Sequence, residues 1–225
     1  MKRENRIPYK GLRFNREEMK QRSVKFLKDI LKRRSIREFS DEEIPLQVIK
    51  NCLKSANSAP SGANMQPWHF VVVSNREIKK EIRRKAEIEE EEFYSNKAPE
   101  EWLEVLEPLG TDANKEFLET APYLIIIFEK KFERLSDGSK KKHYYTKESV
   151  GIATGFLISA LHHAGLVSLT HTPSPMNFLN ELCKRPSNEK PYLILVTGFP
   201  AKNVKVPDIS KKDLDSTATF FPDED

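Results

Sequence analysis

Three arginines lie close together near the start of the chain, and their side chains suit the binding of an anion. Arg33, Arg34 and Arg37 surround Ser35. A guanidinium group presents paired N–H donors that match the oxygens of a phosphate or a carboxylate. The cluster therefore predicts an anion site. A short basic run is more often a solvated linker, so spacing alone leaves both interpretations open.

A loop of small residues is the second candidate. Pro60 and Gly62 end a helical pattern, and Ala63 follows them. Such a turn exposes backbone N–H groups that a ligand can approach closely, although an ordinary turn has the same composition. Ser61 lacks the Gly-x-Ser-x-Gly surroundings of a nucleophilic serine, so we do not expect it to attack a substrate.

A carboxylate and a phenol share one face of a predicted helix. Glu90 and Tyr94 are four residues apart, and Lys115 follows in a weakly patterned segment. A carboxylate together with an ammonium group can clamp a zwitterion. The alternative is that the acidic run 87–92 is only a solvated helix face.

Hydroxyl groups follow a short apolar run near residue 170. Thr170, His171 and Thr172 stand where a strand would end, and the ends of strands often bind ligands in α/β sheets. A simple turn is again the alternative. The histidines of the chain have no metal-binding spacing, so we expect no metal. There is no Gly-x-Gly-x-x-Gly and no Walker motif, so a cofactor would be held in another way.

Alternating helices and strands must position these side chains. Periodicity predicts helices over about 15–31, 45–56, 75–94 and 146–164, the last of them apolar all round and therefore buried. Short apolar runs predict strands at 69–73, 123–128, 166–170 and 192–196, and residues 217–221 have strand-like content. Residues 95–121 carry short helical patterns broken by prolines, which predicts a mobile segment. The pattern indicates one α/β or α+β layer fold without a domain boundary.

Composition limits the class of protein. The 225 residues suffice for one full-sized core, and the two cysteines are too few for a disulfide framework. The longest apolar run, 123–128, is too short to span a membrane, and the first residues lack an apolar signal core. We therefore expect a cytoplasmic protein without a membrane partner. The net charge of +4 and the lack of an aromatic platform beside the lysine run 140–142 argue against a nucleic-acid partner.

Taken together and in order, the motifs resemble the iodotyrosine deiodinase family of the nitroreductase superfamily, and most of all its soluble bacterial members. The resemblance runs from about Phe26 to Phe221. It is carried by residues 33–37, 59–63 with 66–68, Glu90, Tyr94, Lys115, 144–150 and 164–178. General nitroreductases share the arginine start but not the set of Glu90, Tyr94 and Lys115, which is therefore the narrow signal.

The resemblance implies a fold and an assembly. We expect a single nitroreductase-like α+β domain over residues 1–225, with a central mixed sheet flanked by helices. We expect a domain-swapped homodimer in which the arm 201–225 reaches the partner subunit. FMN would bind in two equivalent clefts at the interface, and residues 87–118 would form a mobile lid over each cleft.

The resemblance also implies roles for individual residues in cofactor binding. Thr172 would be catalytic, because its hydroxyl matches the one that bonds flavin N5 and favours one-electron chemistry. Lys211 stands where the family usually has arginine. An ammonium group lacks the bidentate donors of a guanidinium group, which predicts weaker binding of FMN. The full set expected at FMN is Arg33, Arg34, Ser35, Ile36, Arg37, Pro60, Ser61, Gly62, Thr170, His171, Thr172 and Lys211.

The substrate implied by the resemblance is a halogenated tyrosine. Glu90 would take its ammonium group and Lys115 its carboxylate, Tyr94 would close the site, and the backbone N–H of Ala63 would meet the phenolate. The activity would be FMN-dependent removal of iodide, bromide or chloride to give tyrosine, with electrons from a reductase or from NAD(P)H. The alternative is a nitroreductase or quinone reductase that uses NAD(P)H.

Overall fold

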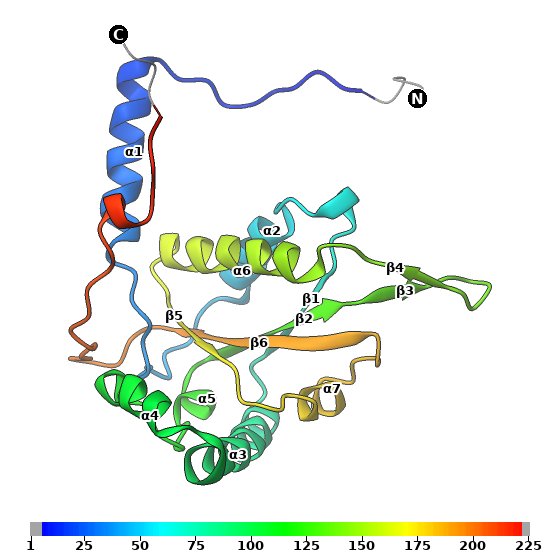
Figure 1. Ribbon diagram of the computed structural model, residues 1–225. Coiled ribbons are helices and arrows are strands. Elements are labelled where there is room, and N and C mark those ends of the chain that lie inside the picture. The colour runs from blue at the N-terminus through cyan, green and yellow to red at the C-terminus, as the bar shows by residue number, and fades with distance from the viewer. Residues whose placement is uncertain (1–5, 222–225) are drawn as a thin grey trace.

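A four-stranded sheet forms the centre of the protein (Figure 1). The computed structural model describes residues 6–221. The strand order is β1 (Trp68–Val73), β2 (Tyr123–Lys130), β6 (Glu189–Gly198) and β5 (Val167–His171), and each neighbouring pair is antiparallel. Ser35 adds a single parallel bridge to Ser168 at the β5 edge. The predicted strands are confirmed, although β6 begins three residues earlier than its apolar run.

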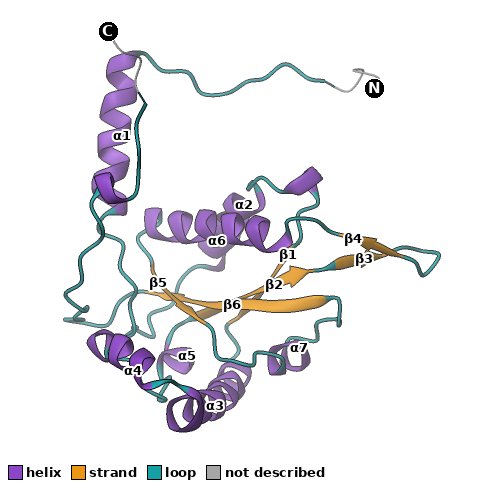
Figure 2. Cartoon of the chain, in the orientation of Figure 1, coloured by secondary structure: helices purple, strands orange, loops and turns teal. Residues whose placement is uncertain are grey.

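Helices cover both faces of this sheet (Figure 2). One face carries α2 (Leu46–Asn57) and α6 (Thr146–His163). The other face carries α3 (Arg76–Glu92), α4 (Glu100–Leu106), α5 (Phe117–Thr120) and α7 (Phe178–Leu182). The arrangement is the α+β fold, a central sheet flanked by helices, that the sequence predicts. The expected sheet was mixed, whereas the four strands are all antiparallel and parallel pairing is limited to the Ser35–Ser168 bridge among the described residues.

Two hydrophobic cores follow from the alternation of side chains along the central strands. On β2, Leu124, Ile126 and Phe128 belong to the core beneath α3, α5 and α7, whereas Ile125 and Ile127 belong to the core beneath α2 and α6. All five are fully buried. Burial of such a side chain contributes roughly 1.5–3 kcal/mol, so this continuous apolar strand anchors both layers.

The helix ends match the signals in the sequence. The side chain of Asn15 caps α1 (Arg16–Ile30) by accepting from the backbone N–H of Glu18 at 2.8 Å, and Asn75 caps α3 in the same way at 3.0 Å from Ile78. Gly165, at a φ of 83°, follows the end of α6 in the left-handed conformation that glycine tolerates best. These caps fix where the first, third and sixth helices begin or end.

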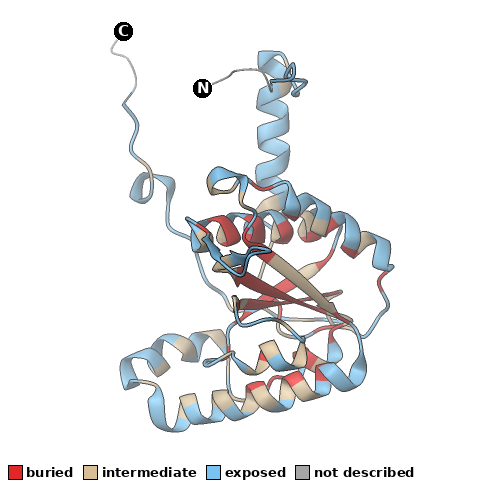
Figure 3. Cartoon of the chain, turned by 90° about the vertical axis from the view of Figure 1, so that its right-hand side faces the viewer, coloured by how far each residue is buried: buried red, intermediate tan, exposed pale blue. Residues whose placement is uncertain are grey.

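Two expectations, about burial and about strands, need correction, and α1 is uncovered as well. No residue of α1 is buried, although its stripe of Val24 and Leu27 is apolar. The helix α6 is not buried all round, because Ile152 and Phe156 are each 43% exposed. No strand forms at 217–221 among the described residues; instead a 3-10 turn precedes it at Leu214–Ser216. Figure 3 shows that α1 and the C-terminal segment stand away from the body, so little of the same chain covers α1.

A small hairpin projects from the sheet. Its strands are β3 (Phe132–Arg134) and β4 (Lys140–Lys142), which pair with each other and lie beyond the end of β2 (Figure 1). Within residues 6–221, no helix has the length and apolar character needed to cross a membrane.

Candidate active site

A cavity of about 720 Å³ lies between the α3–α4 layer and the end of β5. Its lining contains both charged groups and aromatic rings. Seven residues singled out from the sequence meet there: Arg37, Glu90, Tyr94, Lys115, Thr170, His171 and Thr172. They come from four separate stretches of the chain. The volume lies within the range of small-molecule and cofactor sites.

The two charged groups of the predicted clamp bind each other in this structure. Lys115 Nζ lies 3.0 Å from Glu90 Oε2, and the side chains are 3% and 14% exposed. Lys115 also donates to Thr111 Oγ1 at 3.4 Å and to the backbone carbonyl of Asp112. Removing either partner of a buried ion pair leaves an uncompensated charge, which is strongly destabilising. The ion pair places opposite charges side by side at the cavity wall.

Tyr94 lies beside this ion pair. Its hydroxyl donates to Thr111 Oγ1 at 3.3 Å, and Lys115 Nζ lies 5.5 Å from the ring centroid. Burial, reinforced by the negative charge of Glu90, raises the pKa of the Tyr94 phenol, so the group remains a proton donor at neutral pH. Phe93 packs edge-on against both Tyr94 and Trp102, at 5.3 and 5.2 Å between ring centroids.

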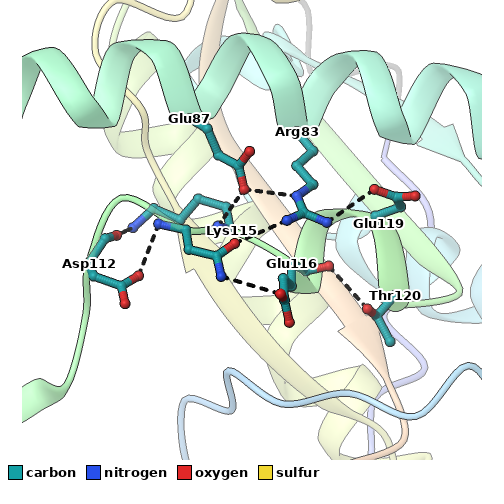
Figure 4. Close-up of polar contacts among 8 residues, drawn as sticks. Arg83, Glu87, Asp112, Lys115, Glu116, Glu119 and Thr120 are labelled. Carbon is teal, nitrogen blue, oxygen red and sulfur yellow. Dashed lines mark hydrogen bonds and ion pairs between the residues drawn. The ribbon is translucent and has the colours of Figure 1, made fainter.

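A polar network ties the segment that carries Lys115 to α3 (Figure 4). Glu87 accepts from the backbone N–H of Lys115 and from Arg83 Nε, each at 2.8 Å. The same guanidinium group donates to Asn114 Oδ1 at 3.1 Å and to Glu119 at 3.2 Å. The backbone at Lys115 is thus fixed independently of the contact that its side chain makes with Glu90.

The three residues at the end of β5 divide between two faces, as strand geometry requires. The side chains of Thr170 and Thr172 are exposed, whereas His171 is buried and packs edge-on against Phe117 at 5.4 Å. Its Nε2 is the one buried side-chain polar atom without a hydrogen-bond partner among the described residues. Burial, together with the nearby charge of Lys115, lowers the pKa of His171 to about 3. The imidazole is therefore neutral at physiological pH.

The arginine cluster continues the site along the edge of β5. The backbone N–H of Ile36 donates to the carbonyl of Ser168 at 3.3 Å, which places the cluster beside this strand. Arg37 reaches the cavity, and Arg34 donates to the carbonyl of Pro207. Lys211 lies four residues beyond that contact and does not line the cavity. The guanidinium groups at this edge suit a phosphate, and the cavity beside them suits a larger, partly apolar group.

The loop at 60–63 does not join these residues within one chain. It lies at the start of α6, where the backbone N–H of Gly62 is 3.4 Å from Ser149 Oγ and a Cβ on Gly62 would meet the Tyr145 ring at 3.0 Å. Ala63 is exposed and has a φ of 49°. Pro60, Ser61, Gly62 and Ala63 are therefore separate from the cavity that holds the other predicted residues.

Several lining residues were not predicted from the sequence. Thr111, Trp102, Asn177 and Tyr192 line the cavity, and Arg83 and Glu87 support it. Thr111 follows Gly110, which has a φ of 58°, and the side chain of Asp112 accepts from the backbone N–H of Asn114. These turn signals in 110–114 mark an ordered connection, but they do not show that its side chains contact α3.

Comparisons with known proteins agree with the geometry. The Nitroreductase family model matches residues 30–199. An iodotyrosine deiodinase of Haliscomenobacter hydrossis is 54% identical over 92% of this chain and 93% of its own length. The iodotyrosine deiodinase of Danio rerio is 44% identical, over 92% of this chain and 71% of its own.

Solved structures give the same result. The crystal structure of an oxidized iodotyrosine deiodinase bound to FMN and 3-iodo-L-tyrosine is 34% identical, with a TM-score of 0.73 over 87% of this chain and 100% of that one. A nitroreductase with bound FMN from Desulfitobacterium hafniense is 17% identical, with a TM-score of 0.64 over 88% of this chain and 98% of that one, and shares the fold. The chain belongs to the iodotyrosine deiodinase family of the nitroreductase superfamily.

Proposed function

We propose that this protein is an FMN-dependent reductive dehalogenase that converts halogenated tyrosine to tyrosine and halide. One observation carries the proposal. A half-buried carboxylate and a buried ammonium group, Glu90 and Lys115, face one cavity that also receives the hydroxyl-bearing end of β5. An amino acid zwitterion carries the two complementary charges. The relatives named iodotyrosine deiodinase, and the related structure with 3-iodo-L-tyrosine, support this substrate.

The residues at the cavity fit FMN. Arg33, Arg34 and Arg37 offer guanidinium donors for its phosphate, with the backbone of Ser35 and Ile36 held beside β5. Thr170 and Thr172 present hydroxyls on the exposed side of that strand. The side chain of His171 lies on the buried side of the strand and lines the cavity from beneath. When bound, FMN supplies the two electrons that cleavage of a carbon–halogen bond requires.

The charged residues would bind and orient the amino acid part of the substrate. Glu90 accepts the ammonium group and Lys115 donates to the carboxylate, so each charge of the existing ion pair finds a new partner in the substrate. Because the side chain of Lys115 is buried and that of Glu90 is only 14% exposed, little additional desolvation of the protein is required. Tyr94 remains protonated and closes the site as a hydrogen-bond donor.

Thr172 would act at the reacting atoms. Its side chain is exposed toward the site and matches the family's hydroxyl donor to the flavin, so we assign it the catalytic role. The overall reaction breaks the carbon–halogen bond, the halogen leaves with the bonding pair as halide, and the ring carbon gains one proton and an electron pair. The surrounding residues orient the ring and exclude water.

We infer that the active unit is a homodimer. The apolar stripe of α1 and the exposed Ile152 and Phe156 of α6 need a covering surface, which a second copy would supply. The arm 201–225 would reach that copy, and the separate loop 60–63 would complete the partner's site. In this assembly the backbone N–H of Ala63 meets the phenolate of the substrate.

Residues 87–118 are proposed to be the lid. Their C-terminal part is fixed to α3 by Glu87 and Arg83, whereas α4, between the two anchored ends, has no buried residue. The position of an element with so little buried surface depends mainly on the groups or ligand that it covers. Substrate bound at Glu90 and Lys115 would therefore order the lid and close the cavity.

We also propose a cytoplasmic location. Cys52 and Cys183 are both free, which is typical of a reducing compartment.

Anaerobic turnover tests the function. The FMN-loaded protein with dithionite and 3-iodotyrosine is expected to form tyrosine catalytically, while reduction of a nitroaromatic by NAD(P)H is measured in parallel. Fast nitro reduction without tyrosine would leave the fold and the cofactor in place and overturn the proposed substrate in favour of a nitroreductase.

A further inference from the structure

The hairpin of β3 and β4 carries the net charge of the protein. Residues 130–142 contain six basic and two acidic side chains, a net of +4, which equals the formal net charge of the whole chain. The remaining residues are therefore balanced between positive and negative charges. The hairpin projects beyond the sheet (Figure 1). Lys140, Lys141 and Lys142 are all exposed.

Most of these cations have no carboxylate partner. Glu129 pairs with Lys131, but Arg134, Lys140, Lys141 and Lys142 form no ion pair among residues 6–221. Arg134 and Lys140 stand directly opposite each other in the hairpin, an arrangement of like charges that is destabilising. Both lie over the ring of Phe132, at 5.6 and 4.8 Å from its centroid, which partly offsets that repulsion. The fold thus maintains an unneutralised basic surface.

This surface adjoins a segment assigned to the cofactor. Tyr145 follows Lys142 by three residues, a reach of at most about 11 Å along the chain. The ring of Tyr145 lies against Gly62 of the proposed cofactor loop, and Ser149 joins the same loop through the backbone N–H of Gly62. A partner seated on the hairpin would therefore sit close to that loop.

The reaction requires an electron donor from outside the chain, and a protein seated on the hairpin would be one. Each dehalogenation consumes two electrons from outside the protein, and the sequence has no Gly-x-Gly-x-x-Gly fingerprint for a nicotinamide cofactor. Electron-transfer complexes are small and transient, and complementary charges set their association rate.

We propose that the basic hairpin, residues 130–142, is the docking surface for an acidic electron-carrier protein that reduces the bound cofactor. The proposal rests on the function proposed above. The carrier supplies the two electrons that the reaction consumes. With one proton, they convert the carbon–halogen bond into a carbon–hydrogen bond and a halide ion. The association is electrostatic, so it weakens as salt screens the charges.

The test compares two reductants in the FMN-loaded protein. With reduced flavodoxin, an acidic carrier, as the probe, the triple variant Lys140→Glu, Lys141→Glu, Lys142→Glu is expected to lower kcat/KM for the carrier at least about tenfold at low ionic strength. Added salt should slow the wild type and should not slow the variant, because the charge of its hairpin is reversed and salt screens the resulting repulsion. With dithionite, tyrosine formation should be the same in both proteins.

A matched control separates local from global charge effects. Lys50, Lys54 and Lys80 are exposed and lie on α2 and α3, so their conversion to glutamate changes the net charge equally. This variant should keep the wild-type rate and salt dependence with flavodoxin. An equal loss in this control, or no loss in the hairpin variant, would overturn the proposal.

Two further outcomes are distinguishable. If the glutamate variant does not fold, the glutamine variant of the same three lysines is measured, and an unchanged kcat/KM for flavodoxin counts against the proposal. If an RNA oligonucleotide binds the hairpin while flavodoxin turnover is unaffected by its charge, the surface is a nucleic-acid site and the carrier proposal is wrong. Absence of tyrosine with dithionite would instead contradict the dehalogenase function itself.

Discussion

Thr172 and His171 are neighbours in sequence and differ in what they can do. Thr172 is exposed at the end of β5, whereas the side chain of His171 points to the opposite side and is buried. The sequence placed both in one cofactor motif, because the resemblance gives the order of residues and not the face on which each side chain lies. The period of a strand explains the division, and it supports our proposal that the hydroxyl of Thr172 acts at the cavity.

Replacing Thr172 by alanine should therefore impair electron transfer and not binding. We expect FMN affinity to be unchanged, dehalogenation to fall at least about tenfold, which corresponds to one lost hydrogen bond to a reacting group, and nitro reduction to be retained. Thr172→Ser keeps the hydroxyl and should recover most of the dehalogenation. Equal dehalogenation in the alanine variant and the wild type would make Thr172 a structural turn residue.

The buried imidazole of His171 should make folding stability depend on pH. Its pKa is about 3 in the folded protein and about 6.5 when unfolded, so between these values the unfolded chain binds a proton that the folded chain does not. Above pH 6.5 the imidazole is neutral in both states and has no effect on the free energy of unfolding. Below pH 6.5 the unfolded chain binds the proton, so the free energy of unfolding decreases as the pH falls. Between pH 7 and 5 the wild type should lose about 2 kcal/mol more unfolding free energy than His171→Leu.

Urea unfolding at fixed protein concentration measures this difference. The exposed His163, replaced by glutamine, serves as the control and should retain the wild-type pH dependence. Identical pH dependence in His171→Leu and the wild type would show that the imidazole is solvated in the folded state.

At the scale of elements, the strands and the capped helices could be predicted and the supports of the site could not. Continuous apolar runs such as 123–128, and caps such as Asn75, are local signals that survive in the structure. The contact between Glu87 and the backbone N–H of Lys115 joins residues 28 positions apart. No local pattern encodes such a contact, so a segment that the sequence marks as irregular is in fact tied to α3 at one end.

Replacing Glu87 by glutamine should release that end of the lid. The charge-assisted bonds to Arg83 and to the backbone N–H of Lys115 would be weakened, at a cost of about 1–3 kcal/mol locally. We expect faster hydrogen exchange in residues 110–118 and a KM for 3-iodotyrosine raised about tenfold. The exposed Glu92, changed to glutamine, is the control, and unchanged exchange in Glu87→Gln would show that the anchor lies elsewhere.

At the scale of the molecule, the sequence predicted more burial than one chain provides. The apolar stripes of α1 and α6 are real, but Leu27 is 53% exposed and Phe156 is 43% exposed. Periodicity identifies a face that must be covered, and it does not say whether the same chain or another copy covers it. This explains why the helices were predicted correctly and their burial was not.

A charge in the α1 stripe should therefore dissociate the proposed dimer. Leu27→Asp is expected to shift the protein to the monomer in sedimentation experiments and to reduce FMN retention, because the loop 60–63 of the second copy would be lost. Lys28→Asp, on the exposed basic side of the same turn, should leave the assembly unchanged. A Leu27→Asp variant that remains dimeric would place the interface elsewhere.

We propose that the ion pair of Glu90 and Lys115 selects a zwitterion. The most direct measurement is dithionite-driven kcat/KM for 3-iodotyrosine and for 2-iodophenol, which lacks both charges, in the wild type and in Glu90→Gln. We expect a strong preference for 3-iodotyrosine in the wild type and a fall of roughly 10–100-fold in kcat/KM for that substrate alone in the variant, because one charge-assisted bond is lost. Equal loss for both substrates, or no preference in the wild type, would contradict it.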